Sequence, residues 1–205
     1  RRPLLYLGGG LNTEIGSRAI RRFNERFRIP SVNTLMGKGV VDENGPTSLG
    51  LLGMFGTPYA NKIIQANDFF FAIGVRWDDR VAEKVGFAIH AKIAYLDINP
   101  QKLHQIRTER RPEFSFLGDA VEALGDLSDY ADRHGITVSI DEWIQHATDL
   151  KRSWPLDYRR DGASIQQAEV LDLLNGFIDE KMIVTTGVGN HQLLAAQYLR
   201  MGHPK

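Results

Sequence analysis

The apolar run Phe69–Ile73 limits the fold of this chain more than any other stretch. A run of this length that ends at a turn residue, here Gly74, is typical of a strand buried on both faces, as in a parallel sheet. Four charged residues and a tryptophan follow at once, between positions 76 and 80. In open α/β sheets ligands bind outside the carboxyl ends of the strands, so these side chains lie where a polar ligand would be held. The alternative interpretation is a solvated loop with an internal ion pair, which contributes little to stability.

Short apolar segments of this kind alternate with helical patterns along the first part of the chain. Further strands are predicted at residues 3–7, 29–33, 92–96 and 114–117, and most are followed by glycine or an acidic residue and then by a helix. Strands that alternate with helices predict a parallel sheet with right-handed crossovers. The predicted fold class is α/β: a doubly wound, Rossmann-like parallel sheet of about five to six strands with helices on both faces, followed by an incomplete second α/β unit.

Three glycines, Gly8 to Gly10, follow the first predicted strand and precede a helix that Asn12 or Thr13 can cap. Glycines in such a turn let a ligand approach the backbone, and the helix N-terminus offers free N–H groups to a phosphate. Their spacing is not Gly-x-Gly-x-x-Gly, so the nicotinamide-dinucleotide fingerprint is not met, and a tight turn alone also explains them. Because the other special loops also follow strands, they should share one edge of one sheet, and this pattern predicts a nucleotide-like ligand.

Composition narrows the class of partner. Lysine plus arginine equals aspartate plus glutamate, at 25 each, so no global field attracts nucleic acid or an anionic membrane. The chain has no cysteine, which excludes disulfide scaffolds, cysteine-ligated metals and cysteine nucleophiles and is compatible with a reducing compartment. No apolar run approaches the roughly 20 residues of a membrane span. We expect a soluble, cytoplasmic protein with a small-molecule partner.

The pattern changes after residue 135. A polar helix over Asp141 to Ser153 and a turn-rich connector through Pro155 occupy residues 136–163. Residues 164–205 then begin a new unit, with a helix, a buried strand over Met182 to Thr186, and a glycine loop that opens a last helix. About 40 residues cannot bury a core alone, so this unit is expected to be incomplete.

Several stretches that contain the glycine and charged loops occur in a fixed order. They are Gly8-Gly-Gly10, Thr34-Leu-Met-Gly-Lys-Gly39, Leu52-Gly-Met54 with Gly56, Gly74-Val-Arg-Trp-Asp-Asp-Arg80, Asp97-Ile98, Gly118-Asp119 and Val184-Thr-Thr-Gly-Val-Gly-Asn-His-Gln192, followed by Ala195-Ala-Gln197. Together they resemble the thiamine diphosphate-dependent 2-oxo acid carboligases and decarboxylases, most closely the large catalytic subunits of acetolactate synthases. The resemblance covers the length of the chain.

The resemblance implies a domain organisation and an activity. Residues 1–135 look like the central nucleotide- or FAD-binding domain, residues 136–163 like a helix and linker, and residues 164–205 like the beginning of the C-terminal thiamine-diphosphate domain. The parent enzyme would be a transferase of branched-chain amino acid biosynthesis that decarboxylates pyruvate and condenses it with a second 2-oxo acid. By the same resemblance it would use thiamine diphosphate and Mg²⁺, form a homodimer, and allow a regulatory subunit.

The resemblance also implies cofactor-binding residues. For FAD or another nucleotide these are Gly9, Gly10, Thr34, Leu35, Arg76, Asp78, Arg80, Val81, Asp97, Ile98 and Asp119. For thiamine diphosphate they are Gly189, Asn190 and His191, although a histidine in this setting can also serve as a capping or packing residue. No catalytic or metal-binding residue is expected, because the family's activating glutamate falls before Arg1 and its metal-binding motif beyond Lys205. The fragment itself is therefore expected to be inactive.

The sequence departs from the family's synthases at four places. They usually have His at position 55, Phe at 77, Gln at 190 and Met-Trp at 193–194, where this chain has Phe, Trp, Asn and Leu-Leu. These differences favour one alternative, a flavin-free carboligase or 2-oxo acid decarboxylase whose nucleotide site is empty or holds ADP. The other alternative is a stand-alone nucleotide-binding module, such as an NAD-dependent deacylase or an electron-transfer flavoprotein domain. The lack of cysteine argues against a zinc-bearing deacylase.

Overall fold

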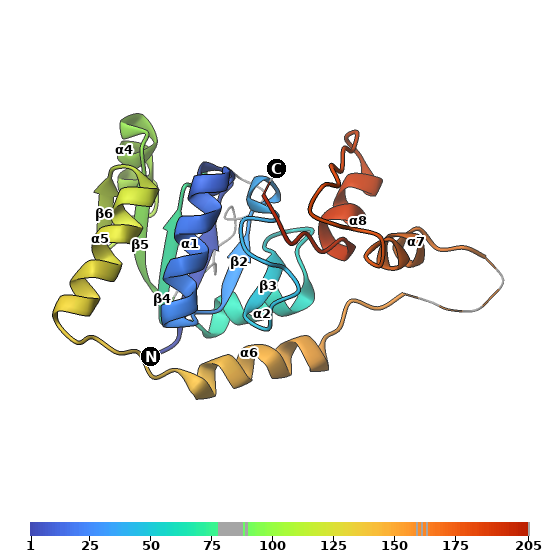
Figure 1. The fold of residues 1–205 in the computed structure, drawn as a ribbon, viewed down its shortest axis with the longest axis horizontal. Helices are drawn as coiled ribbons and strands as arrows, with labels where there is room; N and C mark the ends of the chain where they lie inside the picture. The colour runs from blue at the N-terminus through green and yellow to red at the C-terminus, as the bar shows by residue number, and fades with distance from the viewer. Residues whose placement is uncertain (78–87, 89, 159, 161, 163, 205) are drawn as a thin grey trace.

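A computed structural model shows a six-stranded parallel sheet flanked by helices (Figure 1). It describes residues 1–204 except 78–87, 89, 159, 161 and 163. The strands are β1 (Pro3–Leu7), β2 (Ser31–Asn33), β3 (Ser48–Leu51), β4 (Phe69–Ile73), β5 (Lys92–Asp97) and β6 (Phe114–Leu117). Their order across the sheet is β3-β2-β1-β4-β5-β6, which is the order of a doubly wound fold. The predicted fold class is confirmed for this sheet.

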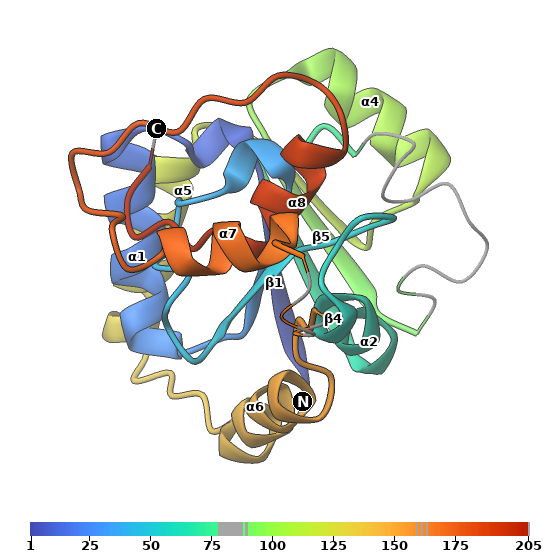
Figure 2. The ribbon, with the colours of Figure 1, turned by 90° about the vertical axis from the view of Figure 1, so that its right-hand side faces the viewer.

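Alternating side chains of the strands face two helical layers. On β1, Leu5 and Leu7 pack with α1 (Glu14–Phe27) and α5 (Ala120–Arg133), whereas Leu4 and Tyr6 face the opposite layer. That layer consists of α2 (Pro58–Ala66), α4 (Pro100–Glu109) and α6 (Asp141–Ser153). Figure 2 shows α1 and α5 on one side of the sheet and α2 and α4 on the other. Because successive strand side chains point to opposite faces, one apolar run supplies both cores.

Short polar residues cap four of the described helices, and Thr13 does so at a position that the sequence predicted. Thr13 caps α1 by accepting from the Gly16 N–H, and Thr57 caps α2. Asn99 caps α4 and Asp119 caps α5 through their side-chain oxygens. Each cap satisfies an N–H group that has no partner inside the helix, so the chain turns from loop to helix at a fixed residue after β1, β3, β5 and β6.

Helix α6 belongs to the core beside the sheet. The indole of Trp143 is buried and its Nε1 donates to the carbonyl oxygen of Pro3, at 2.7 Å. Ala147, one helical turn further on, is fully buried in the same cluster. The expected helix at residues 136–163 is therefore present and tied to β1. The domain boundaries drawn at residues 135 and 163 stay predictions.

Two local predictions differ from the structure. Strand β3 was not among the predicted strands, because Gly50 interrupts its apolar run; in the structure Gly50 has a φ of 71°. Conversely, residues 182–186 form no strand, and Ile183 is 88% exposed. The branched residues there have strand propensity, but among the described residues they have no neighbouring strand to pair with, and pairing rather than propensity makes a strand.

The last part of the chain consists of α7 (Gln167–Leu174) and α8 (Asn190–Tyr198), which pack on each other. The side chain of Asn175 donates to the carbonyl oxygen of Tyr198, and the Tyr198 hydroxyl donates to the carbonyl oxygen of Asp157. Several large apolar side chains of this part, including Phe177, remain exposed. In the described part of the chain, no helix has both the length and the apolar character needed to cross a membrane.

Candidate functional site

The strand order reverses between β1 and β4, and the loops after these two strands touch. The Gly8 N–H donates to the carbonyl oxygen of Ile73, and the Gly10 N–H donates to that of Gly74. A Cβ atom at position 8 would lie 2.1 Å from the Gly74 carbonyl oxygen, and one at position 10 would lie 2.9 Å from the Gly74 Cα. Glycine is therefore required at positions 8 and 10 because the loops after β1 and β4 pack closely on each other. This contact lies at the point where open α/β sheets bind their ligands.

A cavity of about 530 Å³ opens at this reversal point, on the edge where the strands end. We call that edge the crest and this space the crest cavity. Its lining is Tyr6, Gly9, Gly10, Thr34, Leu35, Met36, Leu51, Leu52, Met54, Phe55, Gly74, Arg76, Trp77 and Leu193. The volume is in the range of small-molecule and cofactor sites, and most of the lining is apolar with a few polar groups.

Five of the predicted nucleotide-binding residues meet in the crest cavity: Gly9, Gly10, Thr34, Leu35 and Arg76. They come from the loops after β1, β2 and β4, three adjacent strands. The Arg76 side chain is exposed, and no described carboxylate forms an ion pair with it. The predicted residues Asp78, Arg80 and Val81 lie outside the described residues.

The three remaining predicted contacts lie further along the crest and do not line the cavity. Asp97 ends β5, where its Oδ1 accepts from the Asn99 N–H and its Oδ2 lies 2.9 Å from the Tyr95 hydroxyl. Burial, followed by the nearby Asp97 carboxylate, raises the pKa of Tyr95, so the phenol stays protonated and can donate. Asp119 caps α5, and Ile98 is 69% exposed. Because Asp97, Ile98 and Asp119 lie outside the cavity, they could contact only the far end of a ligand that extends along the crest.

Trp77 forms the floor of the crest cavity. It is 4% exposed and packs edge-on against Tyr6, Phe70 and Tyr95, with ring centroids 5.8 to 6.2 Å apart. Its φ of 54° lies in the left-handed region, which costs free energy for a bulky residue. The aromatic contacts offset that cost and hold the indole in place, so Trp77 is a rigid part of the cavity lining.

Several backbone amides of the glycine loop are engaged in hydrogen bonds to other backbone groups. The N–H groups of Leu11 and Asn12 donate to the carbonyl oxygens of Gly8 and Gly9, and a short 3-10 turn (Gly9–Leu11) separates β1 from α1. The first turn of α1 also carries the acidic Glu14. At the start of α1 the Gly16 and Ser17 N–H groups donate to Thr13, whereas those of Glu14 and Ile15 can have no partner inside the helix, so the expectation that this N-terminus offers free N–H groups to a phosphate stays a prediction. Arg76 is the described cation that lines the cavity.

Helix α8 and the segment after β3 complete the cavity with residues that are not among the predicted cofactor contacts, although positions 55 and 193 are two of those at which the sequence departs from the family's synthases. The Gln197 side chain donates to the carbonyl oxygen of Phe55, at 2.8 Å, which links α8 to this segment. Leu193 and Met54 both line the cavity. The available signal was the run of apolar residues and glycines from Ser48 to Gly56, which indicates close approach to a ligand or neighbour.

The predicted thiamine-diphosphate residues lie at the start of α8 and do not line the crest cavity. Asn190 and His191 are exposed. Gly189 has a φ of 149°, and a Cβ atom there would lie 3.1 Å from the His191 ring; one at Gly187 would lie 3.2 Å from it. The positive φ of Gly189 favours glycine, and at both positions the exposed His191 ring would have to shift slightly to admit a Cβ atom. Among the described residues no cluster of three or more acidic or histidine side chains could hold a metal ion.

Comparison with known proteins identifies the family. Residues 1–127 match the family described as "Thiamine pyrophosphate enzyme, central domain". Acetolactate synthase 1, chloroplastic, of Zea mays is 37% identical over 208 residues, covering 100% of this chain and 32% of that protein. The acetolactate synthase large subunit of Parasynechococcus marenigrum (strain WH8102) is 36% identical over 203 residues, covering 98% of this chain and 32% of that protein. The chain thus spans about a third of the length of these relatives, and it belongs to the thiamine pyrophosphate enzymes, whose central domain it contains.

Proposed function

We propose that the crest binds FAD as part of a thiamine diphosphate-dependent acetolactate synthase. The observation that carries this proposal is the crest cavity itself, because it lies at the strand-order reversal and combines an aromatic floor, Trp77, with an exposed cation, Arg76. An aromatic floor suits a planar ring, and arginine suits a phosphate group. Five residues expected from the sequence to contact the nucleotide line this one space.

The length of the crest favours a dinucleotide over a mononucleotide. The expected contacts run from Thr34 after β2 to Asp119 after β6, across β1, β4 and β5. Neighbouring strands lie about 4.8 Å apart, so this distance is roughly 19 Å. An extended dinucleotide can reach across that distance. We place the flavin in the crest cavity, the pyrophosphate near Arg76, and the adenosine toward Asp97 and Asp119.

In the second unit, we propose that Gly189, Asn190 and His191 contact the diphosphate of thiamine diphosphate. The chemistry of these groups suits an anion, because an amide, an imidazole and the N–H groups of a helix start are all donors. When bound, that cofactor supplies the carbanion chemistry of the reaction, and the protein supplies position and electrostatics. Gly187 and Gly189 lie close to the His191 ring, which is exposed beside the α8 N-terminus.

The whole enzyme would form acetolactate from pyruvate, or join pyruvate to another 2-oxo acid, for branched-chain amino acid biosynthesis. The two relatives described above, both called acetolactate synthases, support this assignment. We further propose Mg²⁺ as the metal, a homodimer that allows a regulatory subunit, and a cytoplasmic location, which the absence of cysteine supports. A flavin-free relative is the second candidate, because Phe55 stands where the synthases usually have histidine.

Titration of the purified chain with FAD, followed by flavin fluorescence, tests the nucleotide site. We expect saturable binding that Arg76→Ala weakens by about tenfold or more, since a charge-assisted hydrogen bond to phosphate is lost. Arg22→Ala is the matched control, because Arg22 is an exposed arginine on α1 that does not line the crest cavity. Equal weakening by both variants, or no binding by a folded chain, contradicts the proposal. Binding of ADP as tight as that of FAD would instead favour the flavin-free relative.

The 205 residues alone are expected to form no acetolactate. They span 32% of the Zea mays relative, and the expected activating glutamate and metal-binding motif are not among them. The measurement is product formation from pyruvate with thiamine diphosphate and Mg²⁺, with a complete acetolactate synthase as the positive control. Detectable turnover by the chain would show that it contains a catalytic site of its own.

A further inference from the structure

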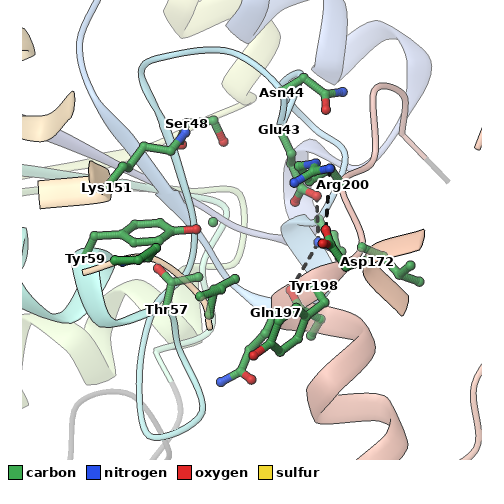
Figure 3. Close-up of a pocket in the computed structure, with 16 residues that line it drawn as sticks. Glu43, Asn44, Ser48, Thr57, Tyr59, Lys151, Asp172, Gln197, Tyr198 and Arg200 are labelled. Carbon is green, nitrogen blue, oxygen red and sulfur yellow. Dashed lines mark hydrogen bonds and ion pairs between the residues drawn. The ribbon is translucent and has the colours of Figure 1, made fainter. Parts of the chain in front are cut away.

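We propose that a second cavity, between α6, α8 and the loop before β3, binds a small organic anion through its carboxylate or phosphate group. This cavity has a volume of about 450 Å³ and shares no lining residue with the crest cavity. We call it the basic cavity. Figure 3 shows Lys151, Tyr59 and Arg200 approaching it from different elements. Its ligand would be distinct from the nucleotide, so its test is independent of flavin binding.

The charges that line the basic cavity do not balance. Lys38 and Glu43 form a buried ion pair of 2.6 Å, so they neutralise each other. Asp172 lies 3.8 Å from Arg200 and 3.9 Å from Arg160, so one carboxylate serves two arginines. These pairs leave part of the Arg200 charge without compensation.

Lys151 adds a positive charge that no described carboxylate pairs with. Its Nζ donates to the backbone carbonyl oxygens of Gly45 and Ser48, at 3.3 and 2.8 Å, which leaves one of its three N–H donors for another acceptor. Burial, and then repulsion from Arg200, lower the pKa of Lys151. An anion between the two cations would relieve that repulsion, because opposite charges at short range favour the charged form of the lysine.

The remaining polar lining supplies neutral donors. Tyr59 points its hydroxyl into the cavity in Figure 3, and burial raises the pKa of this phenol, so it stays protonated. Ser48 also lines the space, as does Gln197, whose side-chain amide already donates to the carbonyl oxygen of Phe55. Two cations and the hydroxyl groups of Tyr59 and Ser48 are donors of the kind that bind carboxylates and phosphates in proteins. The volume exceeds that of a bare ion, which indicates an organic body attached to the anionic group.

The position of the basic cavity gives the ligand a mechanical role. Its walls come from the sheet domain at Ser48 and Tyr59, from α6 at Lys151, and from α8 and the residues after it. An anion held by both Lys151 and Arg200 would link the sheet domain to the segment that carries the proposed thiamine-diphosphate loop. Binding is therefore expected to stabilise the packing of α8 on the sheet.

Isothermal titration calorimetry, which measures the heat of binding, tests the proposal with inorganic phosphate and separately with oxalate. We expect saturable millimolar or tighter binding of at least one, and the tighter of the two identifies the anionic group. Arg200→Gln and Tyr59→Phe should each weaken binding, the first by about tenfold. Arg200→Gln leaves Asp172 beside Arg160, so the fold should survive. Lys151→Met should weaken binding further, but it also removes two hydrogen bonds to the backbone, so its fold is checked by circular dichroism.

Arg22→Gln, which changes an exposed arginine of α1, is the control and should bind as the unsubstituted chain does. Absence of saturable binding for both anions by the folded chain would overturn the proposal. Binding that Arg200→Gln and Tyr59→Phe leave unchanged would overturn it as well, because the anion would then lie elsewhere. FAD affinity should be the same in all these variants, so a failed flavin titration and a failed anion titration are distinguishable.

Discussion

Gly8→Ala is expected to lower the free energy of unfolding by about 3 kcal/mol. The added Cβ would lie 2.1 Å from the Gly74 carbonyl oxygen and 2.6 Å from its carbonyl carbon. Both are backbone atoms held by the hydrogen bond from the Gly8 N–H to Ile73, so neither side can move without separating the ends of β1 and β4. Urea denaturation followed by circular dichroism measures the change. Because the same loops line the crest cavity, flavin binding should weaken in parallel.

Gly125→Ala is the matched control for this variant. Gly125 lies inside α5, and a Cβ atom there would have no atom within 4 Å. Alanine is the better helix former, so this substitution should raise the free energy of unfolding by about 0.5 to 1 kcal/mol. The two variants make the same chemical change and are expected to differ in sign. Similar small effects in both would contradict the close contact of β1 and β4 on which the crest depends.

Lys38→Met is expected to cost about 3 to 5 kcal/mol, because it leaves a buried carboxylate without its cation. The side chains of Lys38 and Glu43 are 13% and 5% exposed, and their Nζ and Oε2 atoms lie 2.6 Å apart. Lys38 also donates to the carbonyl oxygen of Ala196, and Glu43 accepts from the Met201 N–H. The pair therefore links the end of α8 and the residues after it to the loop after β2 through hydrogen bonds. Hydrogen exchange should rise at residues 196–201 along with the loss of stability measured in urea.

The double variant Lys38→Met with Glu43→Gln separates the ion pair from the loss of packing. If an uncompensated charge causes the damage, removing the carboxylate as well should restore part of the stability, giving a coupling free energy of about 1 to 3 kcal/mol. Additive effects of the two substitutions, or a loss below about 1 kcal/mol for Lys38→Met alone, would show that solvent reaches the pair and screens it.

The sheet could be predicted because its strands are short apolar runs. The strands at residues 69–73 and 92–96 were predicted correctly, because buried parallel strands need apolar side chains on both faces and so appear as apolar runs. Strand β3 was missed because Gly50 interrupts it, and its strand geometry comes from pairing with β2. Residues 182–186 were wrongly predicted as a strand, since propensity is local and pairing is a property of the whole fold.

The site was predictable in part for the same reason. Gly9, Thr34 and Arg76 are far apart in sequence, yet they meet because parallel strands bring their carboxyl ends to one edge. Leu193 escaped prediction as a contact because its position depends on how α8 packs against the segment after β3, through the bond from Gln197 to the carbonyl oxygen of Phe55. Packing of a helix against a loop that is distant in sequence produces no periodic pattern of apolar residues, so the sequence does not show which residues it brings together.

The sequence also could not predict that several amides of the glycine loop form backbone hydrogen bonds rather than remain free for a phosphate. A glycine-rich turn before a helix is typical of a phosphate site, but the same residues can close the turn on themselves. Here the Gly10 N–H is used by the carbonyl oxygen of Gly74, and Thr13 caps α1. Which of the two uses applies depends on the distance between the ends of β1 and β4, which the sheet order sets and the loop sequence does not.

Hydrogen exchange of the chain with and without saturating FAD, resolved by mass spectrometry, tests the central claim that the crest cavity is the nucleotide site. The account predicts slower exchange at residues 8–10, 34–37 and 74–77, which surround the cavity, and a smaller effect near Asp97 and Asp119. Residues 38–45 and 151, around the basic cavity, should exchange as before. Slower exchange confined to those residues, or no change anywhere at a saturating FAD concentration, would contradict the account.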